Sequence, residues 1–258
     1  MGKLPGHYWR GFRPDPTGRP GRYSPAVPHS RPRRLLIFRV VVTLLDAVLA
    51  MVARRNYGVP ALPPEGPLLV APNHVSLLDP IAVGIAVVRA GRTPRFVVTA
   101  EVMARPVVGR VLRYFDHVPL DRSRPLDPAV LEGVRVALRR GECVVFYPEG
   151  QVTRDSSYRP GRGLPGLGRL AVEFQAPIVP LAQWGAQHVV GRGALAWRRW
   201  PPRRASVAVL GLPPILPPSG PAAALPARRV VNQVMAALVD GVERLSCTDT
   251  LADPRSRR

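Results

Sequence analysis

The residues best suited to chemistry in this chain are His74 and Asp79, which bound the segment His-Val-Ser-Leu-Leu-Asp. An imidazole has an ordinary pKa near ~6.5, so it can accept a proton at neutral pH. A carboxylate bonded to its other ring nitrogen fixes the tautomer and stabilises the cation that forms. The pair is therefore a candidate general base with its orienting partner. A purely structural interpretation stays open, in which Asp79 caps a helix and His74 is an ordinary loop residue.

The elements around this pair favour a site at the end of a strand. Leu68–Ala71 is short, apolar and bounded by prolines, which predicts a buried strand. Asp79 and Pro80 then suit a helix start, with Asp79 as the N-cap and Pro80 as the first helical residue. His74 is thereby expected on the loop that leaves the carboxyl end of a strand, where open α/β sheets usually place their sites.

Short apolar segments alternate with helical ones over most of the chain, which predicts an α/β fold with a mixed, mostly parallel central sheet flanked by helices. The predicted strands are Leu68–Ala71, Arg95–Ala100, His117–Leu120, Cys143–Tyr147, Ile178–Ala182 and Ser206–Leu210. The predicted helices are Pro80–Arg89, Pro106–Tyr114, Pro128–Arg139, Gly166–Phe174 and Pro226–Leu245.

Composition limits the classes of partner. The chain has 258 residues and a formal net charge of +20, which favours anionic partners such as a membrane surface or a phosphorylated substrate. No recognisable nucleic-acid module is present, so nucleic acid is not expected as a partner. Lys3 is the only lysine, and the richness in Arg, Ala, Pro and Gly is what a GC-rich genome would produce. Cys143 and Cys247 have no metal-ligand spacing, so no metal is expected.

The amino-terminal part divides into a basic Pro/Gly-rich segment and an apolar helix. Between Arg39 and Arg54 a helix rises about 22 Å, less than the ~30 Å hydrocarbon core of a bilayer. Arg39, Thr43 and Asp46 form a narrow polar stripe, so a membrane-interfacial helix fits better than a spanning one. A core helix and a signal anchor remain alternatives. The expected regions are a disordered basic tail (1–34), the interfacial helix (35–56), a catalytic domain (57–245) and a flexible tail (246–258).

Two further loops carry groups that could bind a substrate. Arg122 follows a predicted strand, where a guanidinium could hold a phosphate, although a surface ion pair would explain it equally well. Glu149 and Gly150 follow the strand that contains Val144 and Val145, and a glycine there permits close backbone approach. The same loop adds a hydroxyl and a cation, from Thr153 and Arg154.

Taken in order, four of these stretches resemble the glycerolipid acyltransferase family, the 1-acyl-sn-glycerol-3-phosphate acyltransferases. The resemblance covers roughly residues 35–245, and each block is weak by itself, whereas four in order are specific. The family blocks are Asn-His-x-x-x-x-Asp, a block that ends in Asp-Arg, Phe-Pro-Glu-Gly and a proline-centred apolar strand. The matching residues are Asn73, His74 and Asp79; Asp121 and Arg122; Tyr147, Pro148, Glu149 and Gly150; and Ile178, Val179, Pro180 and Leu181.

The resemblance implies a membrane-associated O-acyltransferase of phospholipid biosynthesis. His74 would deprotonate the hydroxyl of a lysophospholipid, Asp79 would hold His74, and Arg122 would grip the phosphate. The alkoxide would attack the thioester of acyl-CoA or acyl carrier protein, which is a co-substrate, so no cofactor is implied. With 1-acylglycerol-3-phosphate as acceptor the product is phosphatidate. The enzyme would lie on the cytoplasmic face of the cell membrane, peripheral or monotopic, against an anionic surface. The remaining substrate-binding candidates are Asn73, Glu149, Gly150, Thr153 and Arg154.

Departures from the family concern the acceptor. Asp116 stands where the second block usually opens with glycine, and two residues precede Thr153 where the third block usually continues directly with threonine. Lysines that many members carry, near Thr99 and Leu164, are missing. Arg162 or Arg105 could replace them. The alternatives are an acyltransferase for another lipid acceptor, such as a glycolipid or lyso-amino-lipid, or a non-catalytic lipid-binding relative.

Overall fold

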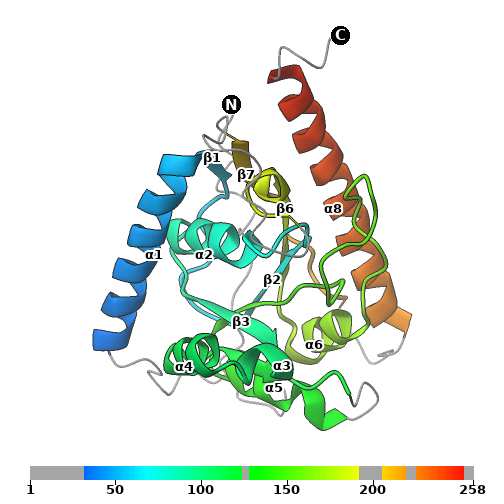
Figure 1. Ribbon diagram of the computed structural model, residues 1–258. Coiled ribbons are helices and arrows are strands. Elements are labelled where there is room, and N and C mark those ends of the chain that lie inside the picture. Colours follow the sequence, from blue (N-terminus) through cyan, green and yellow to red (C-terminus); the bar gives the residue numbers. More distant parts are fainter. Residues whose placement is uncertain (1–31, 124–127, 192–204, 219–224, 253–258) are drawn as a thin grey trace.

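Seven strands form one sheet in the computed structural model (Figure 1), which describes residues 32–123, 128–191, 205–218 and 225–252. The strand order is β1-β7-β6-β2-β5-β3-β4, and all neighbours are parallel except β6 and β7. The strands are β1 (Ala53–Gly58), β2 (Leu68–Pro72), β3 (Pro94–Thr99), β4 (Val118–Leu120), β5 (Cys143–Val145), β6 (Ile178–Trp184) and β7 (Ala205–Gly211). The expected mixed, mostly parallel sheet is confirmed.

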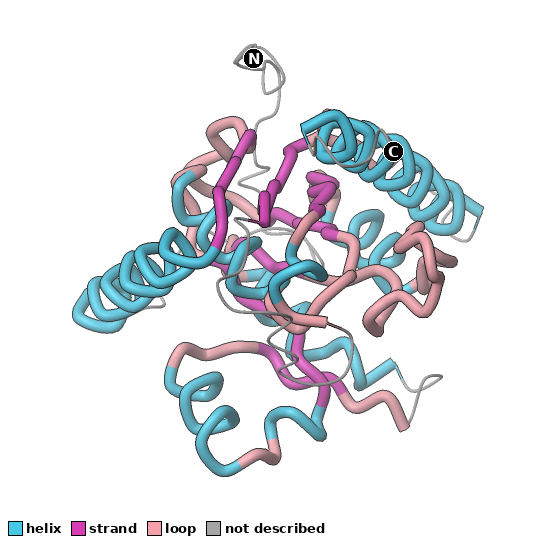
Figure 2. Tube along the Cα trace, turned by 45° about the horizontal axis from the view of Figure 1, so that its top comes forward, coloured by secondary structure: helices cyan, strands magenta, loops and turns pink. Residues whose placement is uncertain are grey.

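Helices cover both faces of this sheet, as Figure 2 shows around the strands. The first face carries α1 (Pro32–Val52) and α2 (Asp79–Arg89), and the second carries α5 (Glu132–Arg139), α6 (Gly166–Phe174) and α8 (Leu225–Ala252). The shorter helical elements are α3 (Ala100–Met103), α4 (Pro106–Tyr114), the 3-10 turn η2 (Pro128–Leu131) and α7 (Ala186–Val189).

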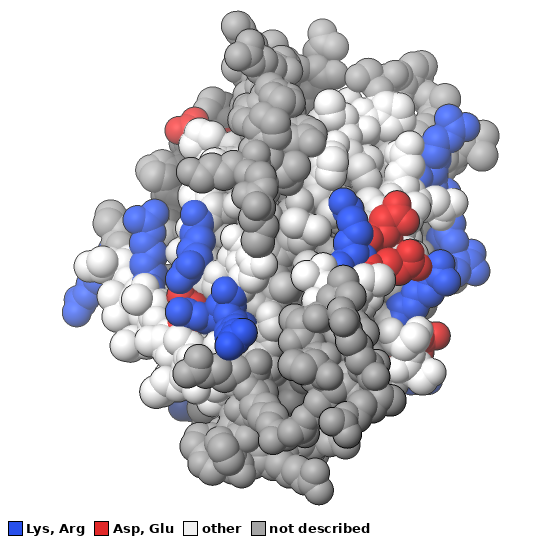
Figure 3. Space-filling model, turned by 90° about the horizontal axis from the view of Figure 1, so that it is seen from above, with Lys and Arg blue, Asp and Glu red and all other residues white. Residues whose placement is uncertain are grey.

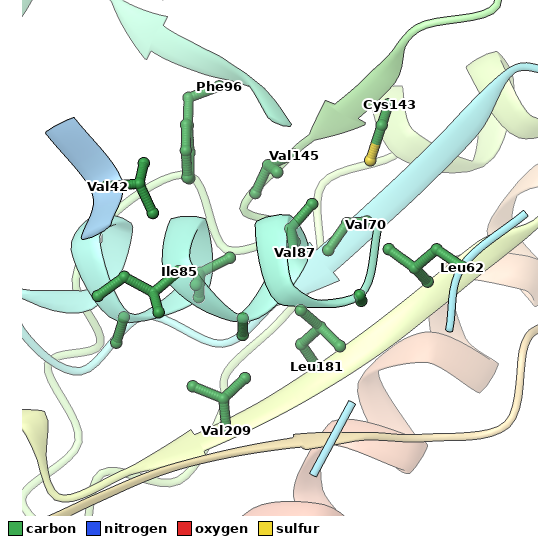
Figure 4. Packing of buried hydrophobic residues seen from close by; sticks show 14 of the residues in the cluster. Val42, Leu62, Val70, Ile85, Val87, Phe96, Cys143, Val145, Leu181 and Val209 are labelled. Atoms are coloured by element: carbon green, nitrogen blue, oxygen red, sulfur yellow. The ribbon is translucent and has the colours of Figure 1, made fainter. Parts of the chain in front are cut away.

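The central strand β2 shows why the core has two halves. All five of its residues are buried, and successive side chains of a strand point to opposite faces. Leu68 and Val70 therefore join the core beneath α1 and α2, while Leu69 and Ala71 join the core beneath α5, α6 and α8. Figure 4 shows the first half, where Val70 lies near Val87 of α2. A strand buried on both faces gives a rigid base for the loop that follows it.

The predicted elements agree closely with the structure, although the short helices α3 and α7 were not predicted and three further differences stand out. Strand β1 was not predicted, because its sequence Ala-Arg-Arg-Asn-Tyr-Gly has no apolar alternation; it pairs in parallel with β7 at the sheet edge. The predicted interfacial helix over 35–56 instead spans Pro32–Val52, and β1 takes its last four residues. The predicted flexible tail over 246–258 is wrong for residues 246–252, which continue α8.

The amino-terminal tail expected over 1–34 lies mostly outside the described residues, and its last three residues begin α1. Among the described residues, α1 contains the one stretch, Arg33–Val52, that is long and apolar enough to cross a membrane. Its exposed apolar side chains include Leu36, Val40, Leu44, Val48 and Met51. Asp46, which was predicted to lie on a narrow polar stripe, faces the protein: it is buried and pairs with arginines of β1 and α2.

Candidate active site

His74 and Asp79 lie together at the carboxyl end of β2, as predicted from their spacing. The His74 Nδ1 atom is 2.7 Å from Oδ2 of Asp79. The side chain of Asp79 is fully buried, whereas that of His74 is 15% exposed. Because Nδ1 faces the carboxylate, Nε2 is the ring nitrogen left for a substrate, and it has no hydrogen-bond partner among the residues described. The geometry is that of a general base with an orienting carboxylate.

Asp79 organises the loop as well as the imidazole. Its Oδ2 atom also accepts hydrogen bonds from the backbone N–H groups of Val75, at 2.6 Å, and Ser76, at 2.8 Å. The expectation that Asp79 is the N-cap is wrong, since Leu78 is the N-cap and Asp79 is the first residue of α2. Its carboxylate bonds the preceding loop and not the first turn of its own helix. The short loop therefore has a fixed shape around the histidine.

Burial sets the electrostatics of Asp79. Loss of solvent raises the pKa of this carboxyl above its ordinary value, and the hydrogen bonds from His74, Ser76 and Val75 oppose that shift. All three donors reach the same oxygen, Oδ2. The other oxygen, Oδ1, is buried and has no hydrogen-bond partner among the described residues.

The backbone of His74 is held from the loop that follows β5. Its N–H donates to Oε1 of Glu149, at 3.3 Å, and its carbonyl accepts from the N–H of Thr153, at 2.7 Å. Glu149 also accepts, on Oε2, from the N–H of Gly161. Burial raises the pKa of Glu149 above its ordinary value. Glu149 and Thr153, both predicted to bind substrate, thus clamp the histidine backbone.

Asn73 and Tyr147 complete the surroundings of the histidine. Asn73 is fully buried, and its side chain exchanges hydrogen bonds with the backbone of Gln183 in β6, which suits a residue that holds the loop. The Tyr147 ring stacks on the His74 ring with centroids 4.3 Å apart and planes 29° apart. Gln183 and Tyr147 were not anticipated as site residues. A buried glutamine within the apolar run of β6 is the signal that could have identified Gln183.

Arg122 comes close to the turn after β5. Gly150 has φ of 69°, a left-handed conformation that favours glycine. A Cβ built on Gly150 would lie 3.9 Å from Nη1 of Arg122 and 2.8 Å from a methyl of Leu164. The exposed Arg122 forms no ion pair with a described residue, although its charge adds to the hydrogen bonding that lowers the pKa of Glu101.

A hollow of about 250 Å³ opens beside Glu149. Three arginines, Arg154, Arg159 and Arg162, line it together with Asp155. Arg162 is exposed and has no ion-pair partner among the described residues, while Arg159 pairs with Glu243 of α8. Of the two arginines considered as replacements for the missing lysines, only Arg162 lines the hollow; Arg105 is the N-cap of α4. The arrangement could hold an anionic group beside Glu149, which bonds the backbone of the candidate base.

Comparisons with known proteins concern the family and the fold. A family model described as Acyltransferase matches residues 54–184. The 1-acyl-sn-glycerol-3-phosphate acyltransferase of Limnanthes douglasii is 33% identical over 122 residues, which are 45% of this chain and 39% of the relative. A probable 1-acyl-sn-glycerol-3-phosphate acyltransferase of Mycoplasma genitalium is 30% identical over 125 residues, 48% of this chain and 46% of the relative. These alignments span less than half the length of the curated relatives.

A solved structure shares the fold. The 1-acyl-sn-glycerophosphate acyltransferase PlsC from Thermotoga maritima superposes with a TM-score of 0.61 and 20% sequence identity, covering 84% of each chain. The shared fold includes most of the described sheet and its helices. At this identity the likeness concerns the fold alone.

Proposed function

This chain belongs to the acyltransferase family, and from that membership we propose that it moves a fatty acyl group from a thioester donor to the hydroxyl of 1-acylglycerol-3-phosphate, giving phosphatidate. The observation that carries the proposal is the His74–Asp79 pair, in which Nδ1 is engaged and Nε2 is left for the acceptor. The donor is acyl-CoA or acyl carrier protein. The reaction belongs to phospholipid biosynthesis.

The residues at the site divide the chemistry between them. Nε2 of His74 takes the proton from the acceptor hydroxyl, and the oxygen attacks the thioester carbonyl. The carbon–sulfur bond then breaks, and the imidazolium returns the proton to the leaving thiolate. Asp79 keeps Nε2 unprotonated before the attack by holding the proton on Nδ1, and it stabilises the imidazolium afterwards. The amides of residues 74 to 76 are engaged by Glu149 and Asp79, so they hold the loop rather than the substrate oxygen.

The acceptor phosphate is assigned to the arginines around the turn after β5. Arg122 reaches Gly150, and Arg154 and Arg162 line the adjacent hollow. Guanidinium groups bind phosphate through paired N–H donors, so they can replace the lysines that many family members carry. Glu149 and Gly150 shape this side of the site. The missing lysines also favour a second candidate, in which the same chemistry acts on a different lipid acceptor.

Helix α1 supports a place on the membrane surface. Most of its apolar side chains are exposed, yet buried Asp46 ties its middle to Arg55 and Arg89 of the domain. In Figure 1 the helix lies alongside the domain next to α2. A helix fixed in this way suits a monotopic enzyme on the cytoplasmic face better than a spanning one. Figure 3 shows basic side chains gathered at two places on one face, which would suit anionic headgroups.

A donor-by-acceptor matrix tests the proposal. Purified full-length protein would be offered acyl-CoA or acyl carrier protein with lysophosphatidate, other lysophospholipids, a glycolipid or monoacylglycerol. Thiol release and lipid product would both be measured. We expect transfer to lysophosphatidate, and Arg162→Ala should raise its KM about tenfold while leaving monoacylglycerol, which lacks the phosphate, unaffected.

Arg169→Ala is the matched control, because Arg169 is an exposed arginine of α6 that does not line the hollow. It should leave the KM for lysophosphatidate unchanged. Transfer to an unphosphorylated lipid alone would replace the proposed acceptor with the second candidate. Thiol release without acylation of any acceptor in the matrix would mean that the thioester is only hydrolysed, and would contradict the acyl-transfer proposal. The absence of both thiol release and lipid product would favour a non-catalytic lipid-binding relative.

A further inference from the structure

Tyr147 carries a hydroxyl that its position does not otherwise require. The residue follows β5, where the family block quoted above has phenylalanine, and its ring stacks on His74. A phenylalanine ring would provide the same stacking surface. The additional oxygen must therefore have a use of its own, or it lowers stability, since a buried polar atom without a partner costs about 1–3 kcal/mol.

The Tyr147 hydroxyl and Oδ1 of Asp79 are complementary. Both atoms are buried, and neither has a hydrogen-bond partner among the described residues. Burial raises the pKa of Tyr147 well above its ordinary value, and the charge of Asp79 adds to that shift, so the hydroxyl stays protonated and is a donor. The carboxylate is an acceptor. One buried donor and one buried acceptor thus lie within electrostatic reach of each other.

The other charged or titratable groups at the histidine are already engaged. Glu149 accepts from the N–H groups of His74 and Gly161, and Oδ2 of Asp79 accepts three bonds. A neutral acceptor also remains, because Oε1 of Gln183 is buried without a partner among the described residues. A carboxylate oxygen is the stronger acceptor, since hydrogen bonds to ionised groups are about twice as strong as neutral ones.

We infer that the Tyr147 hydroxyl donates to Oδ1 of Asp79 through one bridging water molecule, and so acts as a positioning residue for the base. This inference rests on the proposed function only for its kinetic consequence. The hydrogen bond fills the second oxygen of the carboxylate and keeps it ionised against the effect of burial. Tyr147 then holds the pair in two ways, with its ring against His74 and its hydroxyl against Asp79.

The consequence is a change in pH dependence when the hydroxyl is removed. Without that donor the ionised form of Asp79 loses stabilisation, so its pKa rises further. The Asp79 carboxylate, and with it the hydrogen-bonded site, would therefore take up a proton at higher pH in the variant. Because one hydrogen bond to a charged group is lost, the acid limb of kcat/KM should move upward by about one pH unit.

The test compares Tyr147→Phe with Tyr57→Phe. Both changes remove one hydroxyl and keep the ring, and Tyr57 also faces a buried aspartate, Asp46, far from the histidine. The ¹⁵N signals of the His74 ring would be followed against pH in the full-length protein, which needs no activity. In Tyr147→Phe we expect the pH midpoint of the change in these ¹⁵N signals to rise by about one pH unit. In Tyr57→Phe the midpoint should stay at its wild-type value.

Kinetics provide the second readout and separate the two proposals. The acid limb of kcat/KM should move together with the NMR transition in Tyr147→Phe. If the wild type transfers no acyl group, the proposed function fails while the NMR shift still decides this inference. Unchanged NMR transitions in both variants would overturn the inference, and would show that the hydroxyl serves another acceptor such as Gln183.

Discussion

Two buried aspartates, Asp46 and Asp79, lie on the same side of the sheet and have opposite surroundings. Asp46 of α1 has a cationic or hydroxyl donor for each oxygen: Arg55 lies 2.7 Å from Oδ1, Arg89 pairs with Oδ2, and Tyr57 donates to Oδ1 at 3.4 Å. Asp79 concentrates three donors on one oxygen, none of them a permanent cation. Its second oxygen has no partner in the described parts of the chain.

This difference gives the two aspartates different roles: Asp46 joins structural elements, and Asp79 supports the candidate base. Guanidinium groups do not lose their protons at physiological pH, so the Asp46 cluster has one charge state and joins α1, β1 and α2 permanently. The partner of Asp79 is an imidazole, whose proton can be exchanged with a substrate. A buried carboxylate paired with a titratable group retains the freedom that proton transfer needs. We therefore expect changes at Asp46 to affect stability and changes at Asp79 to affect activity.

The largest expected effect is the loss of activity in Asp79→Asn. An amide at this position cannot hold the proton on Nδ1 of His74 in the same way, so the wrong tautomer is favoured and acyl transfer should fall about 10³–10⁴-fold. The amide oxygen can still accept from the N–H groups of Val75 and Ser76. Burial penalises the natural ionised carboxylate, so the free energy of unfolding should change by less than about 1 kcal/mol.

Thiol release under saturating substrate measures this effect, and urea unfolding measures the stability. Asp240→Asn is the matched control, because it makes the same chemical change at an exposed aspartate of α8. If Asp79→Asn kept wild-type activity with an intact fold, Asp79 would not be needed to orient His74. The proposed mechanism and the contrast with Asp46 would then both be wrong.

The second expected effect is a loss of stability in Asp46→Ala. Removal of the carboxylate takes the shared partner from Arg55 and Arg89 and the acceptor from Tyr57. Because the two arginine side chains are 29% and 55% exposed and stay partly solvated, the three lost interactions together should cost about 2–3 kcal/mol. Urea unfolding should show that loss, while activity on detergent-dispersed substrate stays within a few fold of the wild type. Glu132→Ala is the control, since the Glu132–Arg139 pair is about half exposed and should contribute under about 1 kcal/mol.

Local sequence signals predicted most of the elements and the central pair of the site. Helices such as Pro106–Tyr114 and Gly166–Phe174 were predicted to the residue, because proline, glycine and apolar spacing are local signals. His74 and Asp79 were found for the same reason, as they share one short loop. Strand β1 was missed because edge pairing with β7, more than 140 residues along the chain, supplies what its polar sequence lacks.

Contacts between distant segments account for the rest. The partners of Asp46 could not be predicted, since a periodic pattern shows that a helix has a polar stripe but does not show what faces it. The bonds of Asn73 join it to Gln183, 110 residues away, and the ring of Tyr147 meets His74 from a neighbouring strand. Only the parallel placement of β2 beside β5 and β6 brings these groups together.

The smallest of these effects concerns His117, a partly buried residue beside Phe38 of α1. Its Nδ1 accepts from the backbone N–H of Phe96, and the nearby charge of Asp116 only partly opposes the effect of burial. Burial, helped by Arg95, lowers its pKa from 6.5 to about 4. The folded state thus resists protonation that the unfolded chain accepts, so its contribution is complete above pH 6.5 and is lost as pH falls toward 4. Between pH 7 and 5 the wild type should lose about 2 kcal/mol more unfolding free energy than His117→Gln, measured by urea unfolding at both pH values. If wild type and His117→Gln lost the same unfolding free energy, His117 would contribute nothing to the acid sensitivity of the fold. The contrast between buried ionisable groups would then be limited to the two aspartates.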